Sequence, residues 1–240
     1  MIKKDNKLLC NEDKIKNIFN KNYSVINNDI EKMIESILID KKGKRRILEI
    51  ILKRQENKNI CPQMIDGFIY QKIIEKDDHS IIKELTTKLP NGIIHLKKSP
   101  SVNYQYLQDL LINQNFKEAD KFTQQCLCKI VESKTNSKKN WLYFTDIQFI
   151  PKSDLFTLDL LWTIYSKGKF GFSIQKKIWL KNNKKWDKLW EEICWIKKGL
   201  MRRYPEEFIW NLDAPEGHLP LFNQLRGTQT LIHLLNHIDW

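Results

Sequence analysis

Apolar residues in the first hundred positions recur at three- and four-residue spacing, which is the pattern of short amphipathic helices. The stretches that carry this spacing are residues 15–19, 30–38, 47–51, 65–74 and 81–85. Pro62 precedes the fourth stretch, where a proline fits the first turn of a helix. Because no repeat of fixed period is visible, the pattern predicts a small irregular helical bundle.

The most regular stretch of the second half, residues 151–179, predicts one long helix followed by a sharp stop. Its apolar stripe at helical spacing consists of Leu155, Leu158, Trp162 and Tyr165. Ser153 or Asp154 is expected to cap the start of this helix with a side-chain oxygen. Gly168 is expected to supply the left-handed residue that ends it. The spacing by itself favours a packed core over a ligand site.

Further helices are expected on both sides of this stretch. Residues 104–111 and 115–130 predict an antiparallel pair joined by a short polar turn. Asn115 and Glu118 have the spacing of a capping box at the start of the second helix of the pair. Another helix is expected over residues 186–194, and a last one from Phe222 to Leu235.

Two segments of this half combine large rings with turn residues. Phe170 and Phe172 flank Gly171, which has no side chain, so backbone or a flat ligand can approach closely. Residues 195–220 carry several rings among glycines and prolines. An apolar loop of this length either folds back as core or lines a concave site, and the pattern leaves both outcomes open.

Composition changes sharply between the two halves of the 240-residue chain. All eight tryptophans lie in residues 141–240, and none lies in the first 98. Turn residues around positions 90–92 and 99–101 punctuate the connection. We therefore expect two domains, a helical bundle over residues 1–98 and a second, also helical, domain over residues 99–240.

The net charge of +12 invites a nucleic-acid interpretation that the composition weakens. Lysine, isoleucine and asparagine are crowded together in the first half, and all three have codons rich in adenine and thymine. Mutational bias in an AT-rich genome, such as that of a plastid, would supply such lysines without selection for phosphate binding. The charge therefore indicates solubility first and a polyanionic partner only weakly.

Neither secretion nor a membrane span is expected. The N-terminal residues have no apolar signal core, they do not have the composition of a transit peptide, and no run of about 18 apolar residues exists. The five cysteines are scattered without metal-type spacing, so buried free thiols in a reducing compartment are favoured.

Several motifs of the second half match one protein family in the correct order. They are YLQDLLINQNFKEADKFTQQCL, DLFTLDLLWTIYSKGKFGFSIQKKIW, APEGHLP and LRGTQTLIHLL. Across roughly residues 100–238 the chain resembles the genomes-uncoupled-four family of tetrapyrrole-binding proteins.

This resemblance implies an all-helical core shaped like a cupped hand that binds protoporphyrin IX and magnesium protoporphyrin IX and stimulates magnesium chelatase. Members from cyanobacteria and algae are similar in also carrying an N-terminal helical bundle. The implied location is the stroma of a plastid or the cytoplasm of a cyanobacterium.

A porphyrin is a flat apolar disc with two propionates on one edge, so its site needs an apolar slot with cations at the rim. The family holds its ligand with an asparagine and an arginine, and these motif positions correspond to Asn223 and Arg226. The residues expected to form the slot are Phe208, Trp210 and Leu219, with Phe144, Phe149 and Leu155 opposite. For Arg202 and Arg203 a solvated charged face is favoured over contact with the second propionate.

No metal ligand is expected, because a carrier of both metal-free and magnesium porphyrin gains little from fixed axial ligation by His218. No residues form a nucleophile-and-base constellation or a phosphate-cradling loop, so the chain is not expected to be an enzyme. The implied partner is the large porphyrin-binding subunit of magnesium chelatase, approached by a monomer. The alternative is a basic helical scaffold or a single-stranded nucleic-acid-binding protein; nucleic acid is not expected as a partner, and peripheral membrane association stays open.

Overall fold

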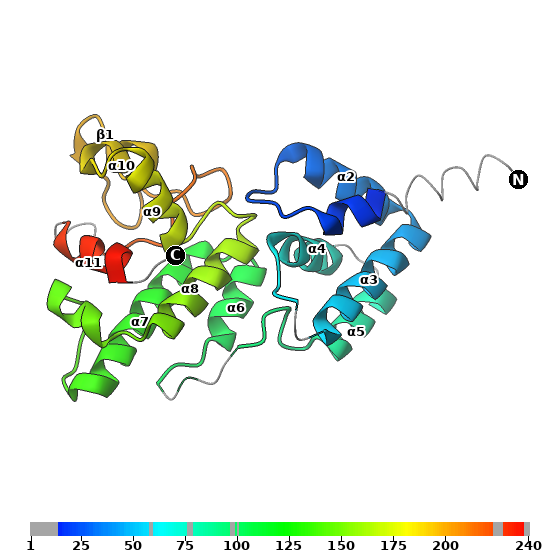
Figure 1. Cartoon of the computed structure of the whole chain (residues 1–240), viewed down its shortest axis with the longest axis horizontal. Helices are drawn as coiled ribbons and strands as arrows, with labels where there is room; N and C mark the ends of the chain where they lie inside the picture. The colour runs from blue at the N-terminus through cyan, green and yellow to red at the C-terminus, as the bar shows by residue number, and fades with distance from the viewer. Residues whose placement is uncertain are drawn as a thin grey trace, which may run out of the picture. The chain divides into compact units, whose positions relative to one another are not determined.

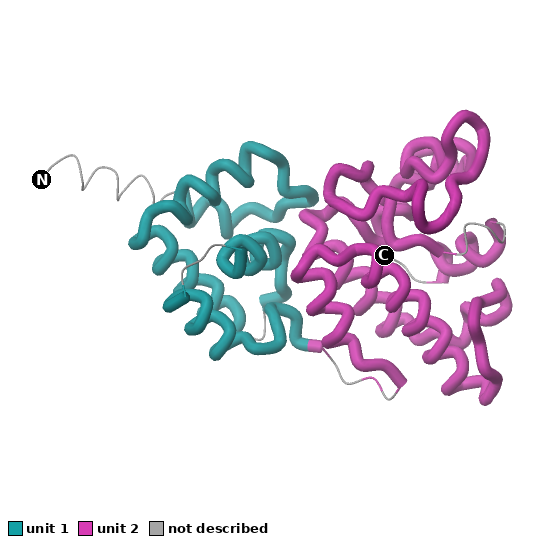
Figure 2. The backbone as a smooth tube through the Cα atoms, turned by 180° about the vertical axis from the view of Figure 1, so that it is seen from behind, with its two compact units in different colours: residues 1–95 teal, residues 96–240 magenta. Residues whose placement is uncertain are grey.

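The computed structural model describes residues 14–57, 60–75, 79–96, 99, 101–222 and 228–237. Its contacts divide the chain into two compact units, residues 1–95 and residues 96–240 (Figure 2). Whether residues 1–98 and 99–240 are domains that fold independently stays a prediction. Both units are built almost entirely of helices, so the expectation of an all-α fold is confirmed.

The first unit is a bundle of short helices, as its apolar spacing predicts. Residues 14–20 are helical, followed by α2 (Asn28–Ile39), α3 (Lys41–Glu56), α4 (Met64–Glu75) and α5 (His79–Lys88). The Asn27 and Asp40 side chains cap α2 and α3 by accepting hydrogen bonds from backbone N–H groups. A β-carbon at Gly43 would lie 2.4 Å from the Ile37 carbonyl oxygen, so glycine permits the tight junction between these helices.

The second unit contains the remaining elements. They are α6 (Gln105–Ile112), α7 (Phe116–Thr135), the 3₁₀ helix η1 (Phe144–Phe149), α8 (Lys152–Tyr165), α9 (Phe172–Lys181), α10 (Trp186–Glu192), β1 (Ile196–Lys197), β2 (Leu200–Met201) and α11 (Gln229–His237). Helices α6, α7 and α8 lie side by side, while α11 packs on η1 and α9 (Figure 1). None of the helices in the described ranges is long and apolar enough to cross a membrane.

The stretch around α8 forms the core of this unit, as its spacing favours. Trp162, Phe116 and Phe170 pack against one another with ring centroids 5.3–6.3 Å apart. The Trp162 indole N–H donates to the Thr123 hydroxyl at 3.0 Å, so its polar group is satisfied inside the core. Each of these three rings is at most 1% exposed.

Local signals at the helix ends are partly confirmed. Gly168 has a φ of +80° after α8, as expected, and the Asn115 side chain caps α7 by accepting from the Glu118 N–H. The expected side-chain cap at Ser153 or Asp154 is wrong, because α8 begins directly after Pro151 without one. The Asp154 carboxylate instead accepts a hydrogen bond from the Tyr104 hydroxyl on the neighbouring segment.

Two further differences lie in the last quarter of the chain. The final helix begins at Gln229 rather than at Phe222, which is buried against Phe172 outside any helix. The antiparallel hairpin β1–β2 is not foreseen by the apolar spacing. Its two turn residues, Lys198 and Gly199, have φ values of 51° and 78°, which is the left-handed geometry that two-residue hairpin turns favour.

Candidate functional site

Residues 215–222 fold back onto α7 and α9, and hydrogen bonds to the backbone groups of this segment hold it there. The Gln175 side-chain amide on α9 donates to the carbonyls of Gly217, at 3.0 Å, and Pro220, at 2.8 Å. The Gly171 N–H donates to the Leu219 carbonyl at 3.0 Å. The missing side chain of Gly171, noticed in the sequence, makes room for the Asp159 carboxylate and the Thr163 hydroxyl on α8, which lie 2.7 and 2.8 Å from where a β-carbon would be.

Asp120 on α7 anchors the end of this segment. Its Oδ1 accepts a hydrogen bond from the Leu221 N–H at 2.6 Å, although the two residues are 101 positions apart in the chain. Burial raises the pKa of this carboxyl to about 8, because the charged form loses its hydration. At neutral pH the carboxyl is therefore mostly protonated.

His218 is a buried structural histidine in the same segment. Its Nδ1 lies 2.7 Å from the Ile193 carbonyl oxygen and therefore carries the proton, so Nε2 accepts from the Ile209 N–H at 3.0 Å. Burial lowers the pKa of the ring, which keeps it neutral. The Trp195 indole N–H, in turn, donates to the His218 carbonyl at 2.8 Å. With both ring nitrogens engaged, His218 holds the fold, and axial metal ligation would require breaking the bond from Ile209.

Within the described ranges, no group of three or more histidine, cysteine or acidic side chains could hold a metal ion. Cys126 and Cys128 are buried as free thiols, whereas Cys61 is exposed and Cys194 half-buried. Burial raises the pKa of Cys126 to about 12, so this thiol stays protonated and unreactive.

The expected apolar slot residues of the broken segment are mostly inside the protein. Leu219 is fully buried, and Phe208 is buried against the imidazole of His218, with ring centroids 5.6 Å apart. Trp210 is half-buried between Phe208 and Tyr204, and its indole N–H donates to the Pro205 carbonyl at 2.9 Å. Of the two outcomes left open by the sequence, Phe208 and Leu219 thus contribute to core, and Trp210 and Tyr204 reach the surface.

The other half of the expected slot divides between core and surface. Leu155 on α8 is fully buried. Phe144 and Phe149 on η1 are 47% and 40% exposed, and Phe144 lies against the imidazole of His233 on α11 with centroids 5.2 Å apart. The His237 Nε2 donates to the Ile150 carbonyl at 2.8 Å, which fastens α11 to the end of η1.

Two exposed rings beside η1 were not among the expected site residues. Trp141 and Tyr143 are 37% and 55% exposed and contact each other edge to face. Together with Phe144 and Phe149 they form what we call the η1 ring patch. The run Trp141-Leu142-Tyr143-Phe144, three rings in four residues, is the sequence signal for it, since a single buried face cannot take all three.

Asn223 and Arg226 lie outside the described residues, but both flanks of their segment are placed. On one side, Phe222 is 1% exposed and packs on the Phe172 ring, directly after the anchor at Asp120. On the other side, α11 begins at Gln229 and carries His233 against the η1 ring patch. The segment therefore connects the anchor on α7 and α9 to the helix that packs beside the exposed rings.

The two other arginines considered from the sequence serve different purposes. The Arg202 guanidinium donates to the Glu207 carbonyl and to the Cys194 sulfur, so it braces its own loop. Arg203 is exposed. Arg202 is therefore a structural residue rather than part of a solvated charged face.

Comparison with known proteins gives a consistent result. A family model described as GUN4-like matches residues 97–238. The chain is 45% identical over 196 residues to the uncharacterized protein ycf53 of Porphyra purpurea, which covers 82% of each chain. It is 38% identical over 143 residues to the chloroplastic tetrapyrrole-binding protein of Arabidopsis thaliana, covering 56% of this chain and 54% of that one. The solved structure of GUN4 from Chlamydomonas reinhardtii is 41% identical, with a TM-score of 0.54, over 60% of this chain and 93% of that one.

Proposed function

The chain belongs to the GUN4-like family, and from this premise we propose that it is a non-catalytic, tetrapyrrole-binding regulator. Its second unit takes protoporphyrin IX or magnesium protoporphyrin IX and stimulates magnesium chelatase. The algal and chloroplastic relatives support a place in a plastid, and a Ycf53-like protein of Synechocystis, 38% identical over 179 residues, supports the cytoplasm of a cyanobacterium as the alternative.

The η1 ring patch is the observation that carries this proposal. Four aromatic side chains within nine residues remain between 37% and 55% exposed, although most large rings of this unit are buried. Exposed clusters of this kind mark binding surfaces, because their burial by a ligand releases apolar area from water. A porphyrin has the flat apolar face that such rings accept, by offset stacking or edge-to-face contact.

The engaged state of His218 favours holding the ligand by its faces and propionates rather than through a central metal. Such a site accepts the metal-free and the magnesium form alike, since neither needs an axial bond from the protein. The magnesium ion of the metal-bound form would belong to the ligand and would require no bond from His218.

A cation at the rim completes the site. Arg226, together with Asn223, follows the anchored Leu221–Phe222 pair and precedes α11, whose His233 contacts Phe144. A guanidinium pairs with a carboxylate through two parallel hydrogen bonds, which suits a propionate at the edge of the disc.

Replacing Arg226 by alanine should weaken porphyrin binding by about 1–3 kcal/mol, the value of one hydrogen-bonded charge contact. Quenching of tryptophan fluorescence during a protoporphyrin titration measures the affinity. Arg203→Ala is the matched control, because Arg203 is an exposed arginine of the same unit. An Arg226→Ala variant that binds as tightly as the control would remove Arg226 from the site.

The effect on magnesium chelatase is regulatory, so it must come from contacts that differ between two states of that enzyme. A coupled assay should show a higher chelation rate with the full chain than without it. The Arg226→Ala variant should need more porphyrin to reach the same stimulation. If the chelation rate at saturating porphyrin is the same with and without the chain, the regulatory role is refuted, whereas the proposal that the chain binds porphyrin still stands.

A further inference from the structure

Positive charge is concentrated in one short part of the chain. Residues 167–203 contain twelve lysines and arginines but only three acidic residues, a net charge of +9 out of the +12 of the whole protein. The other 203 residues together carry only +3. Lysines are frequent along the whole chain, as a codon bias of the genome would produce, but outside this part acidic residues nearly balance them.

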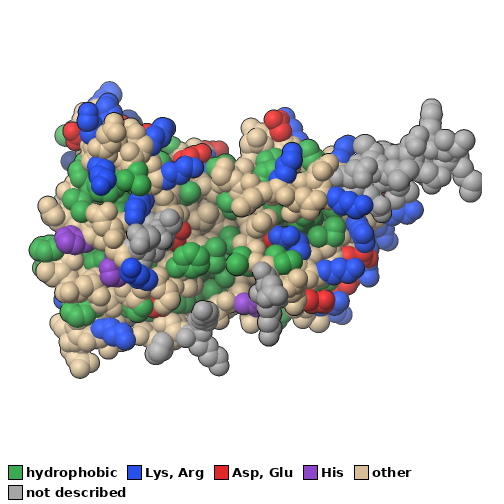
Figure 3. All heavy atoms as spheres, viewed as in Figure 1, with side chains coloured by type: hydrophobic (Ala, Val, Ile, Leu, Met, Phe, Trp, Pro, Cys, Tyr) green, Lys and Arg blue, Asp and Glu red, His purple; other side chains and the backbone are tan. Residues whose placement is uncertain are grey.

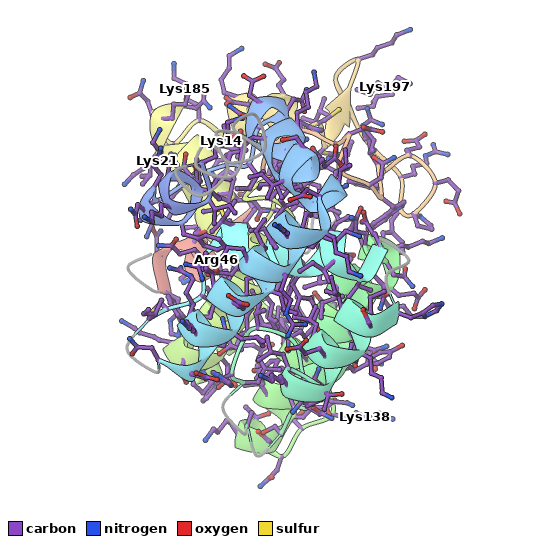
Figure 4. All side chains as sticks on the ribbon, turned by 90° about the vertical axis from the view of Figure 1, so that its right-hand side faces the viewer. Lys14, Lys21, Arg46, Lys138, Lys185 and Lys197 are labelled. Atoms are coloured by element: carbon purple, nitrogen blue, oxygen red, sulfur yellow. The ribbon has the colours of Figure 1, made fainter. Side chains whose placement is uncertain are left out.

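The fold gathers these charges over α9, α10 and the β1–β2 hairpin, which pack together (Figure 3). We call the exposed lysines of this region that form no ion pair the basic cap; they are Lys177, Lys184, Lys185, Lys197 and Lys198. Lys185 and Lys197 project away from the body of the unit on opposite sides (Figure 4). The cap thus surrounds the end of the unit instead of forming one flat face.

The acidic residues of the region form no ion pair with the basic cap, although the Lys184 ammonium lies over the Trp179 ring, 5.7 Å from its centroid. Glu192 pairs with Lys181 at 2.9 Å, and Glu191 pairs with Lys188 at 3.0 Å. Throughout the described ranges, no ion pair reaches any of the five cap lysines. Like charges within a Debye length of about 8–10 Å repel, so unpaired neighbours such as Lys184 and Lys185 do not stabilise the free protein.

The backbone gives a second indication that these charges are retained at a cost. Lys184 and Lys198 occupy turn positions with φ values of 60° and 51°. Glycine or asparagine adopts this left-handed conformation readily, whereas another residue type costs about 1–2 kcal/mol. Lysine at both positions is therefore the less stable choice for the fold.

We infer that the basic cap is a docking surface for an acidic protein. The inference rests on the proposed function for the identity of that protein, which is the chelatase subunit that receives the porphyrin. Opposite charges steer two surfaces together and fix their orientation. The cap lysines are distinct from the η1 ring patch and from Arg226, so docking leaves the residues of the proposed ligand site available.

An acidic protein fits the cap better than the other polyanions. A nucleic acid strand binds such surfaces by stacking its bases on free rings. Here the indoles beside the lysines contact one another as tilted pairs, Trp179 with Trp186 at a centroid distance of 4.9 Å and Trp186 with Trp190 at 5.2 Å. A flat anionic bilayer would meet only one side of the cap, whereas a shaped protein surface can contact both sides.

The test compares two full-length variants that each lose four positive charges. The cap variant is Lys184→Asn, Lys185→Gln, Lys197→Gln and Lys198→Asn. The control variant replaces Lys14, Lys21, Lys41 and Lys42, all exposed in the first unit, by glutamine. Because asparagine tolerates the left-handed turns, the cap variant should keep or raise the thermal midpoint of unfolding.

Binding to the immobilised large subunit of magnesium chelatase is then measured between about 50 and 300 mM NaCl. The cap variant should bind at least about tenfold more weakly than the wild type at low salt and lose most of the salt dependence. The control variant should bind within about twofold of the wild type. Porphyrin titrations should give the same affinity for all three proteins.

Three results would overturn the inference: equal losses in the two variants, no loss in the cap variant, or wild-type protein that does not bind the subunit. Cap-dependent binding of phosphatidylglycerol vesicles or of a single-stranded oligonucleotide, without cap-dependent subunit binding, would also overturn it. Cap-dependent subunit binding by a protein that binds no porphyrin would support the docking surface and refute the proposed ligand instead.

Discussion

Gly171 occupies the turn between α8 and α9, and replacing it by alanine should strongly destabilise the second unit. Its φ of +140° lies in a region that residues with a β-carbon avoid. An alanine β-carbon would also lie 2.7 Å from the Asp159 Oδ1 and 2.8 Å from the Thr163 hydroxyl. Both distances are shorter than a carbon and an oxygen tolerate, so the neighbours must move.

The magnitude follows from what that movement breaks. The unfavourable φ costs about 1–3 kcal/mol. Asp159 accepts from the Ser173 N–H at 2.8 Å at the start of α9, and displacing the carboxyl forfeits this cap, worth about 1–2 kcal/mol. The sum of about 2–5 kcal/mol is a large part of the roughly 5–15 kcal/mol that stabilises a typical domain.

Urea unfolding followed by tryptophan fluorescence measures this loss, and two other glycines provide graded controls. Gly199 has a φ of +78° with nothing within 4 Å, so Gly199→Ala should cost only about 1 kcal/mol. At Gly217, with a φ of +74°, the β-carbon would meet the Ile178 Cδ1 at 2.8 Å and the Ile193 Cγ2 at 2.9 Å. The Ile178 Cδ1 is the end of a side chain and can rotate away, whereas the Ile193 methyl is fixed close to its backbone, so Gly217→Ala should fall between the other two variants.

The same substitution should also reach the ligand segment. The Gly171 N–H holds the Leu219 carbonyl, and any shift of the turn moves the chain that leads to Arg226. Porphyrin affinity should therefore fall in Gly171→Ala but not in Gly199→Ala. A Gly171→Ala variant that loses less than about 1 kcal/mol of unfolding free energy would show that the turn is looser than its contacts imply.

Three further predictions concern pH and domain organisation. Burial raises the pKa of Asp120 from 3.8 to about 8, so the native state keeps a proton that the unfolded chain releases. The free energy of unfolding should therefore fall as the pH rises from about 4 to about 8. Urea titrations at a series of pH values should show a smaller change of this free energy for Asp120→Asn. Burial lowers the pKa of His218 below 6.5, so its contribution to the free energy of unfolding should be complete above that pH and decline in acid. The same urea titrations should show no such decline for His218→Asn. A fragment of residues 99–240 should bind protoporphyrin within about twofold of the full chain, since the rings of the proposed site lie in the second unit; a fluorescence titration that shows no binding by a folded fragment would place part of the site on the first unit.

At the candidate site, residue types alone predict which side chains are apolar but not which of them are exposed. The sequence directs attention to Phe144 and Phe149, which are exposed, and to Phe208, Leu155 and Leu219, which are buried. An aromatic or aliphatic residue at helical spacing or in an apolar loop has the same pattern in both environments. Only the packing of neighbouring elements decides which rings remain available to a ligand.

The sequence by itself determined the helices, the turn at Gly168 and the cap at Asn115, because each depends on residues a few positions apart. It also determined the family, because several motifs follow one another in the order that the family has. The tertiary structure alone decided that Asp120 would hold Leu221, 101 residues away, and that His218 would spend both ring nitrogens on the backbone. The sequence shows the excess of positive charge in residues 167–203, but only the structure shows that α9, α10 and the hairpin that follow one another there pack together. Contacts between distant residues depend on how whole elements pack. Helical periodicity shows which face of a helix is buried but does not indicate which other element packs against that face.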